Sequence, residues 1–280
     1  MLEPFQEEFM RRAIAELALI GLAGGALGCW VVLYRLSYAA ESLSHSLFPG
    51  LVLATLAGVP LLAGGAPAIG LAALAIVAIA RVPVLSREVA VGVVVTTMLG
   101  LGALLALSPA SPPGVQAILF GDILGPSDAD LIAAMALAVT VLAGLSLVHP
   151  RLLAGGFDRD AARALGVRPG LAEAVLAVLL AAAIVVAVQG LGNLLVVALF
   201  VGPAAAARQL SERIAPMLAL AVAIALLAGL AGLYLSYYAG TAGGASVALA
   251  IVAAYLISLP AGWALRLRRS RPVRPEATIG

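Results

Sequence analysis

The sequence predicts an all-α protein that crosses a membrane many times, and its composition and charge pattern carry this prediction. Of its 280 residues, 63% are apolar and only 11% are charged, and the mean hydropathy of +1.13 lies far outside the range of soluble domains. Two long stretches carry no charged side chain, Val89 to Gly121 and Ile214 to Leu265. Because a spanning helix needs about 20 apolar residues, the second stretch is long enough for two spans.

Hydropathy predicts about nine transmembrane helices within one domain, residues 1–280. Eight is the alternative, because the third predicted span is short and the sixth and seventh nearly fuse. The predicted spans are Ala13–Tyr34, Ser42–Leu62, Ala66–Ala80, Val89–Leu107, Leu131–Val148, Leu171–Gln189, Leu191–Ala207, Pro216–Tyr237 and Ala245–Leu265.

The arginines predict how these spans are oriented. Lys and Arg favour the cytoplasmic side of a membrane, and this chain has 16 basic residues, all of them Arg. We place the basic tail, residues 266–280, in the cytosol and alternate backwards through nine spans. Only Arg11 and Arg12 then fall outside, so 16 minus 2 leaves 14 arginines inside. The predicted topology is therefore N-terminus out and C-terminus in.

Glu41 and His45 are the only side chains between Leu36 and Ala80 that can carry a charge near neutral pH. On a helix, positions i and i+4 lie on one face, so the two side chains can meet at one point. A charge at the bilayer centre costs about 2.5–3.5 kcal/mol on insertion scales, so intramembrane acids usually line a pathway. A carboxylate with an imidazole suits divalent transition metals. The pair predicts a metal path, and the alternative is a hydrogen-bonded pair that only locks two helices.

The segment from Phe157 to Gly166 has the pattern of a short helix outside the bilayer. Asp158 is the predicted N-cap, and Asp160 lies in the first turn, where a carboxylate favours the helix dipole. Gly166 fits the C′ position. A helix of about two turns is not stable alone in water, so it must rest on a surface. That surface is either its own membrane domain or a soluble partner.

Other polar side chains receive structural interpretations. Glu16, Glu173 and His149 are interpreted as interfacial or helix-capping residues, and Cys29, the single cysteine, as a buried apolar filler. The outer connection, residues 108–130, is either a tethered loop or a docking and gating segment. Its end, Ser127 to Asp130, reads as a capping box that starts the next span.

Missing motifs argue against two enzyme classes. The chain contains no lysine, so it has no phosphate-binding Gly-x-x-x-x-Gly-Lys-Ser/Thr loop of its own. It also lacks His-Glu-x-x-His and has only 2 histidines, which argues against an intramembrane metalloenzyme. The energy for any transport must come from another subunit or from an ion gradient.

Several segments resemble the permease subunits of zinc, manganese and iron ABC importers, the ABC-3 family. The matching segments, in chain order, are Ala40–Gly50 (an acid-x-x-x-His segment followed by Pro-Gly), Leu119–Gly125 (an outer loop), Phe157–Val167 (a coupling helix), Gly192–Pro203 with Arg208, and Leu235–Tyr238 with Gly243-Gly244. One difference is that this chain has Glu41 where the family pattern usually has Asp.

The resemblance implies a type II ABC importer-like permease in the bacterial cytoplasmic (inner) membrane. It implies that Glu41 and His45 contact the metal and that Ser37 and Pro49 are candidate path-lining residues. It also implies coupling to an ATPase through Phe157, Asp158, Asp160, Ala161, Arg163, Ala164, Leu165 and Gly166. The cytosolic coupling helix would span about 158–166.

The same resemblance implies the partners and the cargo. The expected partners are a second copy of the chain, two ATP-binding cassette subunits, an extracytoplasmic metal-binding protein and the lipid bilayer, with no nucleic acid. The expected cargo is a divalent zinc, manganese or iron ion, with no permanently bound cofactor and no enzymatic activity in this subunit. The alternatives are a permease for vitamin B12 or iron chelates and a secondary metal transporter.

Overall fold

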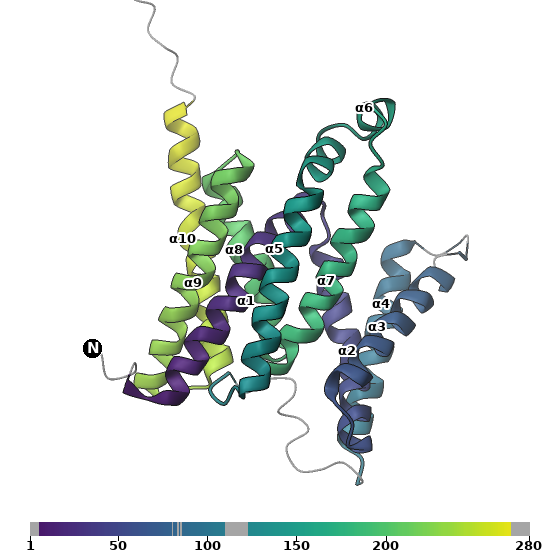
Figure 1. Ribbon diagram of the computed structural model, residues 1–280, viewed down its shortest axis with the longest axis vertical. Helices are drawn as coiled ribbons and strands as arrows, with labels where there is room; N and C mark the ends of the chain where they lie inside the picture. Colours follow the sequence, from purple (N-terminus) through teal and green to yellow (C-terminus); the bar gives the residue numbers. More distant parts are fainter. Residues whose placement is uncertain (1–5, 80, 83, 85, 110–122, 270–280) are drawn as a thin grey trace, which may run out of the picture.

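A computed structural model describes residues 6–79, 81, 82, 84, 86–109 and 123–269. Within these residues the chain forms ten α-helices and no strand, which confirms the all-α class (Figure 1). The helices are α1 (Glu8–Leu33), α2 (Ser37–Ala57), α3 (Leu61–Ile79), α4 (Arg87–Ala106), α5 (Asp128–Phe157), α6 (Arg159–Ala164), α7 (Pro169–Leu191), α8 (Asn193–Leu210), α9 (Ile214–Ala239) and α10 (Gly243–Arg269).

Seven helices in the described ranges are long and apolar enough to cross a membrane, so the structure does not match the expected count of about nine. These are α1, α3, α4, α5, α7, α9 and α10. Helix α2 misses the criterion because the polar residues between Ser37 and Ser46 lower its hydropathy. Helix α8 misses it because its described apolar part, Leu195–Leu210, is short. The chain is nevertheless a multi-pass membrane protein.

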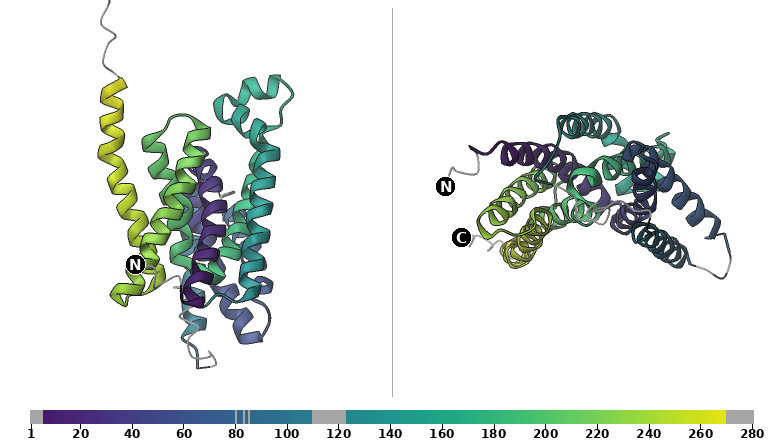
Figure 2. Two further views of the ribbon diagram at one scale, coloured as in Figure 1. Left: turned by 60° about the vertical axis from the view of Figure 1, so that its left-hand side comes forward. Right: turned by 90° about the horizontal axis from the view of Figure 1, so that it is seen from below.

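The long helices run alternately up and down, and α2 lies at a junction between two groups of them (Figure 1). One group is α2, α3 and α4, which pack on one another, and the other is α1, α5 and α7–α10 (Figure 2). Helix α2 also packs on α7 and α8, and it thereby connects the groups. The helix with Glu41 and His45 is therefore in contact with both parts of the molecule.

Glycines let the neighbours of α2 approach its backbone closely. A Cβ atom on Gly50 of α2 would collide with the carbonyl oxygen of Gly64 in α3, and the reverse holds for Gly64. A Cβ on Gly102 of α4 would lie 2.9 Å from the backbone nitrogen of Pro49. Such close approach through small residues is the usual way in which membrane helices pack. It fixes the C-terminal half of α2, beyond Glu41 and His45.

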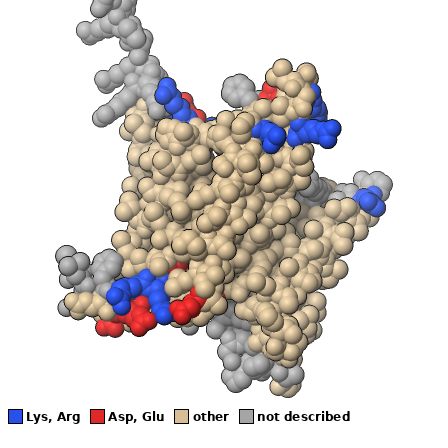
Figure 3. Space-filling model, viewed as in Figure 1, with Lys and Arg blue, Asp and Glu red and all other residues tan. Residues whose placement is uncertain are grey.

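On the face shown in Figure 3, most charged side chains gather at the two ends of the molecule, with one further basic patch at the right-hand side. One end, formed by α6, the α8–α9 turn and the end of α10, carries Arg163, Arg213 and Arg266. At the opposite end, Arg12 of α1 donates hydrogen bonds to Glu8 (3.1 Å) and to Asp128 of α5 (2.7 Å). Acidic side chains occur at both ends (Figure 3), and the orientation with the C-terminus in and the N-terminus out stays a prediction from the arginines.

Single cysteines in a Cys29→Ala background should report this topology. We expect an impermeant thiol reagent added outside intact cells to label cysteines at Ser108 and Thr241, but not at Arg168 or Arg213. Ser108 follows α4 and Thr241 lies in the exposed α9–α10 turn, whereas the two arginines lie at the basic end. Labelling at Arg168 from outside would overturn both the topology and the cytosolic placement of α6.

Candidate functional site

Helix α2 begins earlier than hydropathy predicts, because α1 ends at Leu33 and a tight turn follows. The N–H of Tyr34 donates to the carbonyl of Trp30 (2.9 Å), and the N–H of Leu36 donates to that of Val31 (2.8 Å). Arg35, between them, has a left-handed backbone with φ of 58°. Since α2 starts at Ser37 and not at Ser42, Glu41 and His45 both lie within its first three turns.

The structure places both predicted metal residues on one face of α2. Glu41 is exposed, His45 is half-buried, and Tyr38 nearby is 49% exposed. Within the described ranges, no three His, Cys, Asp or Glu side chains come together in a way that could hold a metal ion. The described part of one chain therefore offers a carboxylate and an imidazole, and no third ligand of these types beside them.

The two candidate path-lining residues have different surroundings. Ser37 is half-buried at the first position of α2, close to Glu41 in sequence. Pro49 is buried within α2, where Gly102 of α4 crosses it. The lining role of both residues stays a prediction, and burial against α4 makes it less favourable for Pro49.

The predicted short helix is confirmed as α6, with the caps that the sequence predicts. The Asp158 carboxylate accepts hydrogen bonds from the N–H groups of Asp160 (2.9 Å) and Ala161 (3.0 Å). Arg163 donates to the Asp160 carboxylate at 2.9 Å. At the other end Gly166 has φ of 77°, a left-handed conformation that costs a glycine little. These contacts hold both ends of a helix that is too short to be stable alone.

One side of α6 rests on its own domain and the other is exposed. Ala162 is buried, and α6 packs on both α5 and α7. Ala161 and Ala164 are exposed, and Leu165 is 81% exposed. Both predicted supports fit this arrangement. Its own membrane domain covers one face of α6, and the exposed second face is available to a soluble partner. The side chain of Phe157 lies outside the described part of the structure.

Two further predicted segments fall partly outside the described residues. Of the outer-loop segment Leu119–Gly125, residues 119–122 lie outside, whereas Ile123 is buried in the core. The capping box that starts α5 is confirmed, since Ser127 and Asp130 exchange hydrogen bonds between side chain and backbone. The basic tail is described only as far as Arg269, and residues 270–280 lie outside.

Sequence reasoning missed several buried polar groups. Glu16 is not interfacial but 2% exposed, and its carboxylate lies against Gly190 near the end of α7. The signal was present, because Glu16 follows Ala13 and precedes Ile20 on the buried face of α1. Ser42, Ser44 and Ser46 of α2 are buried as well, and Ser42 donates to the Tyr38 carbonyl at 2.7 Å.

Comparison with known proteins places the chain in one family. The model of the ABC 3 transport family matches residues 6–262. The manganese import system permease protein ScaB of Streptococcus parasanguinis is 31% identical over 253 residues, which cover 90% of each chain. The chelated iron transport system membrane protein YfeC of Yersinia pestis is 34% identical over 263 residues, 93% of this chain and 88% of YfeC.

A solved structure agrees with these relatives. A chain of PsaBC from Streptococcus pneumoniae, determined in complex with Fab, superposes with a TM-score of 0.86 at 28% sequence identity. The superposition covers 95% of this chain and 97% of that one. The similarity therefore extends over nearly the whole fold. From the family match and these relatives together, the chain belongs to the ABC 3 transport family.

Proposed function

We propose that this chain is the permease subunit of an ATP-driven importer of divalent transition metal ions, with manganese or zinc as the favoured cargo. It is a multi-pass protein of the cytoplasmic membrane and a transport subunit, not itself an enzyme. Relatives named for manganese and for chelated iron support a metal cargo. The observation that carries the proposal is the Glu41–His45 pair on α2, in a stretch without any other charge.

A second copy of the chain would complete the path. In the single chain Glu41 and Tyr38 are exposed on α2, and a carboxylate facing lipid is costly. Polar groups at membrane depth are tolerated where they line a water-filled cavity or are covered by protein. A partner copy over this face would enclose a polar path between the two copies. This arrangement supports a homodimer with the metal path along its axis.

The proposed site is built for transit and not for storage. Structural zinc sites usually have four protein ligands, whereas this chain offers a carboxylate and an imidazole. An ion that must leave as readily as it enters should be held weakly. Water, Ser37 or the same pair from the second copy would supply the remaining ligands.

Energy would reach this site through α6. The chain has no ATP-binding loop, so we propose two separate ATP-binding cassette subunits and an extracytoplasmic metal-binding protein as partners. The exposed side chains of Ala161, Ala164 and Leu165 offer a contact surface for the ATPase. This helix also speaks against a secondary transporter, which needs no such docking element.

A permease for vitamin B12 or iron chelates is the second candidate, and the name of YfeC speaks for a chelate. A chelated metal has its coordination positions filled, so it would not need a carboxylate and an imidazole together in the path. Glu41 and His45 therefore favour a bare ion.

Uptake into proteoliposomes that contain the complete importer tests the proposal. We expect ATP-dependent uptake of radioactive manganese, zinc or ferrous ion, with one of them preferred. Vitamin B12 and a ferric chelate serve as competing cargoes. Uptake of a chelate or of B12 in place of bare ions would establish the second candidate. Metal uptake driven by an ion gradient without ATP would establish a secondary transporter.

A further inference from the structure

The end of α1 is tied to the end of α5 by a specific hydrogen bond. The Tyr34 hydroxyl donates to the backbone carbonyl of Leu152 at 2.7 Å, between segments 118 residues apart in the sequence. The tyrosine ring lies beside Gly155 and Gly156, where a Cβ on Gly155 would be 3.3 Å from the Tyr34 hydroxyl oxygen. Tyr34 thus uses space that the two glycines of α5 leave open.

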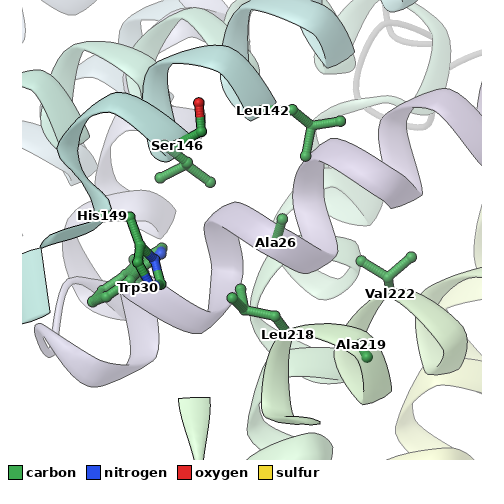
Figure 4. A pocket seen from close by; sticks show the side chains of 9 residues that line it. Ala26, Trp30, Leu142, Ser146, His149, Leu218, Ala219 and Val222 are labelled. Carbon is green, nitrogen blue, oxygen red and sulfur yellow. The ribbon is translucent and has the colours of Figure 1, made fainter. Parts of the chain in front are cut away.

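An aromatic contact supports the same junction from one turn below. The rings of Trp30 and His149 meet edge to face, with centroids 5.4 Å apart and planes at 83°. Both lie at one end of a groove of about 690 Å³ between α5 and α9, with α1 as its floor (Figure 4). Trp30 and Tyr34 therefore both contact α5 at the end of α1, through a ring contact and a hydrogen bond.

This junction lies between the two parts of the molecule that transport must connect. Beyond Leu152, α5 runs on to Phe157 and leads directly into α6. Beyond Tyr34, the tight turn at Arg35 leads directly into α2, which carries Glu41 and His45. The N–H of Leu36 bonds back to the Val31 carbonyl, so the first turn of α2 is attached to the last turn of α1. Displacement of α1 is therefore passed to α2.

We propose that Tyr34 is a positioning residue that makes α2 follow the movement of α6. The inference rests on the proposed import function, in which α6 receives the displacement from the ATPase. When α5 moves with α6, the bond from Tyr34 to Leu152 carries the end of α1 with it, and the Arg35 turn carries the start of α2. Without that bond the start of α2 follows α6 less closely, because it is then moved only through helix packing such as that of α2 on α7.

Tyr34→Phe tests the inference because it removes the hydroxyl and keeps the ring. In proteoliposomes with the complete importer, we expect normal assembly and normal stimulation of ATP hydrolysis by loaded binding protein. The number of manganese or zinc ions moved per ATP hydrolysed should fall by about fivefold, the effect of one lost hydrogen bond. Tyr255→Phe, which removes a phenol hydroxyl from α10, should leave this ratio unchanged. A merely structural role would lower assembly and both rates together.

A second pair of variants approaches the junction from α5. A Cβ on Gly155 would lie 2.9 Å from Pro169 Cβ and would crowd the Tyr34 hydroxyl, whereas a Cβ on Gly156 makes ordinary contacts at 3.6 Å or more. We expect Gly155→Ala to lower the ion-to-ATP ratio and Gly156→Ala to leave it unchanged. An unchanged ratio in both Tyr34→Phe and Gly155→Ala would overturn the inference.

The two proposals fail in different ways. If the unmodified importer moves no bare metal ion, the import function itself is wrong. If it moves metal and the Tyr34 and Gly155 variants move as much per ATP, only the role of Tyr34 is wrong. Equal losses in the Gly155→Ala and Gly156→Ala variants would show a general effect of filling space, and this too would overturn the inference.

Discussion

Replacing Glu41 by Gln, or His45 by Ala, is expected to abolish metal uptake while the permease still enters the membrane and binds its ATPase. Each change removes one of two protein ligands from the proposed transit site. Even residues that only support a metal ligand typically contribute 10- to 100-fold to metal affinity or activity, so we expect a loss of about a hundredfold or more. Uptake of radioactive manganese or zinc into cells that carry each variant is the measurement.

Two controls sharpen this experiment. Glu7→Gln removes a carboxylate from the exposed start of α1 and should leave uptake normal. Glu41→Asp keeps the charge but shortens the side chain by one methylene, so it should retain partial uptake with a shifted preference among metals. Near-normal uptake by both Glu41→Gln and His45→Ala would reduce the pair to a structural contact within the bundle.

The spans that hydropathy located well are those whose apolar character is continuous. The predicted span Pro216–Tyr237 became α9, Ile214–Ala239, and Ala245–Leu265 became α10, Gly243–Arg269. The start of α2 was missed because hydropathy measures partition into lipid and not helix formation. Ser37 to Glu41 form a helix whose polar groups lower its hydropathy, so they were read as a connection. The error occurs at the residues that are proposed to line the path.

The caps of α6 were predictable because they depend on residues close together in the sequence. Asp158 bonds to groups two and three positions away, and Gly166 needs only its own backbone freedom. The burial of Glu16 against Gly190 and the bond from Tyr34 to Leu152 were not, because they depend on which helices pack together. The remaining ligands of the proposed metal site are harder still to predict from the sequence, since they would come from outside this chain.

Changes to the exposed side of α6 are expected to disconnect the permease from its ATPase. Leu165→Asp and Ala161→Asp place a charge on side chains that are exposed in the single chain and that we propose to be buried against the partner. Gly166→Val puts a β-branched residue at φ of 77° and should cost about 1–2 kcal/mol at the C-terminal cap. The permease dimer should stay intact in all three variants, because these residues lie outside the membrane helices.

The measurement is ATP hydrolysis of the reconstituted importer with and without loaded binding protein, together with co-purification of the ATPase. We expect Leu165→Asp and Ala161→Asp to lose either co-purification of the ATPase or the stimulation of ATP hydrolysis by binding protein. Gly166→Val should weaken the same property. Gly170→Asp is the matched control, since a side chain there meets nothing within 4 Å and a carboxylate favours the first turn of α7. A helix that transmits movement from the ATPase should lose this function when its contact surface is charged. Full stimulation of ATP hydrolysis and full metal uptake in every α6 variant would therefore show that α6 only connects α5 to α7.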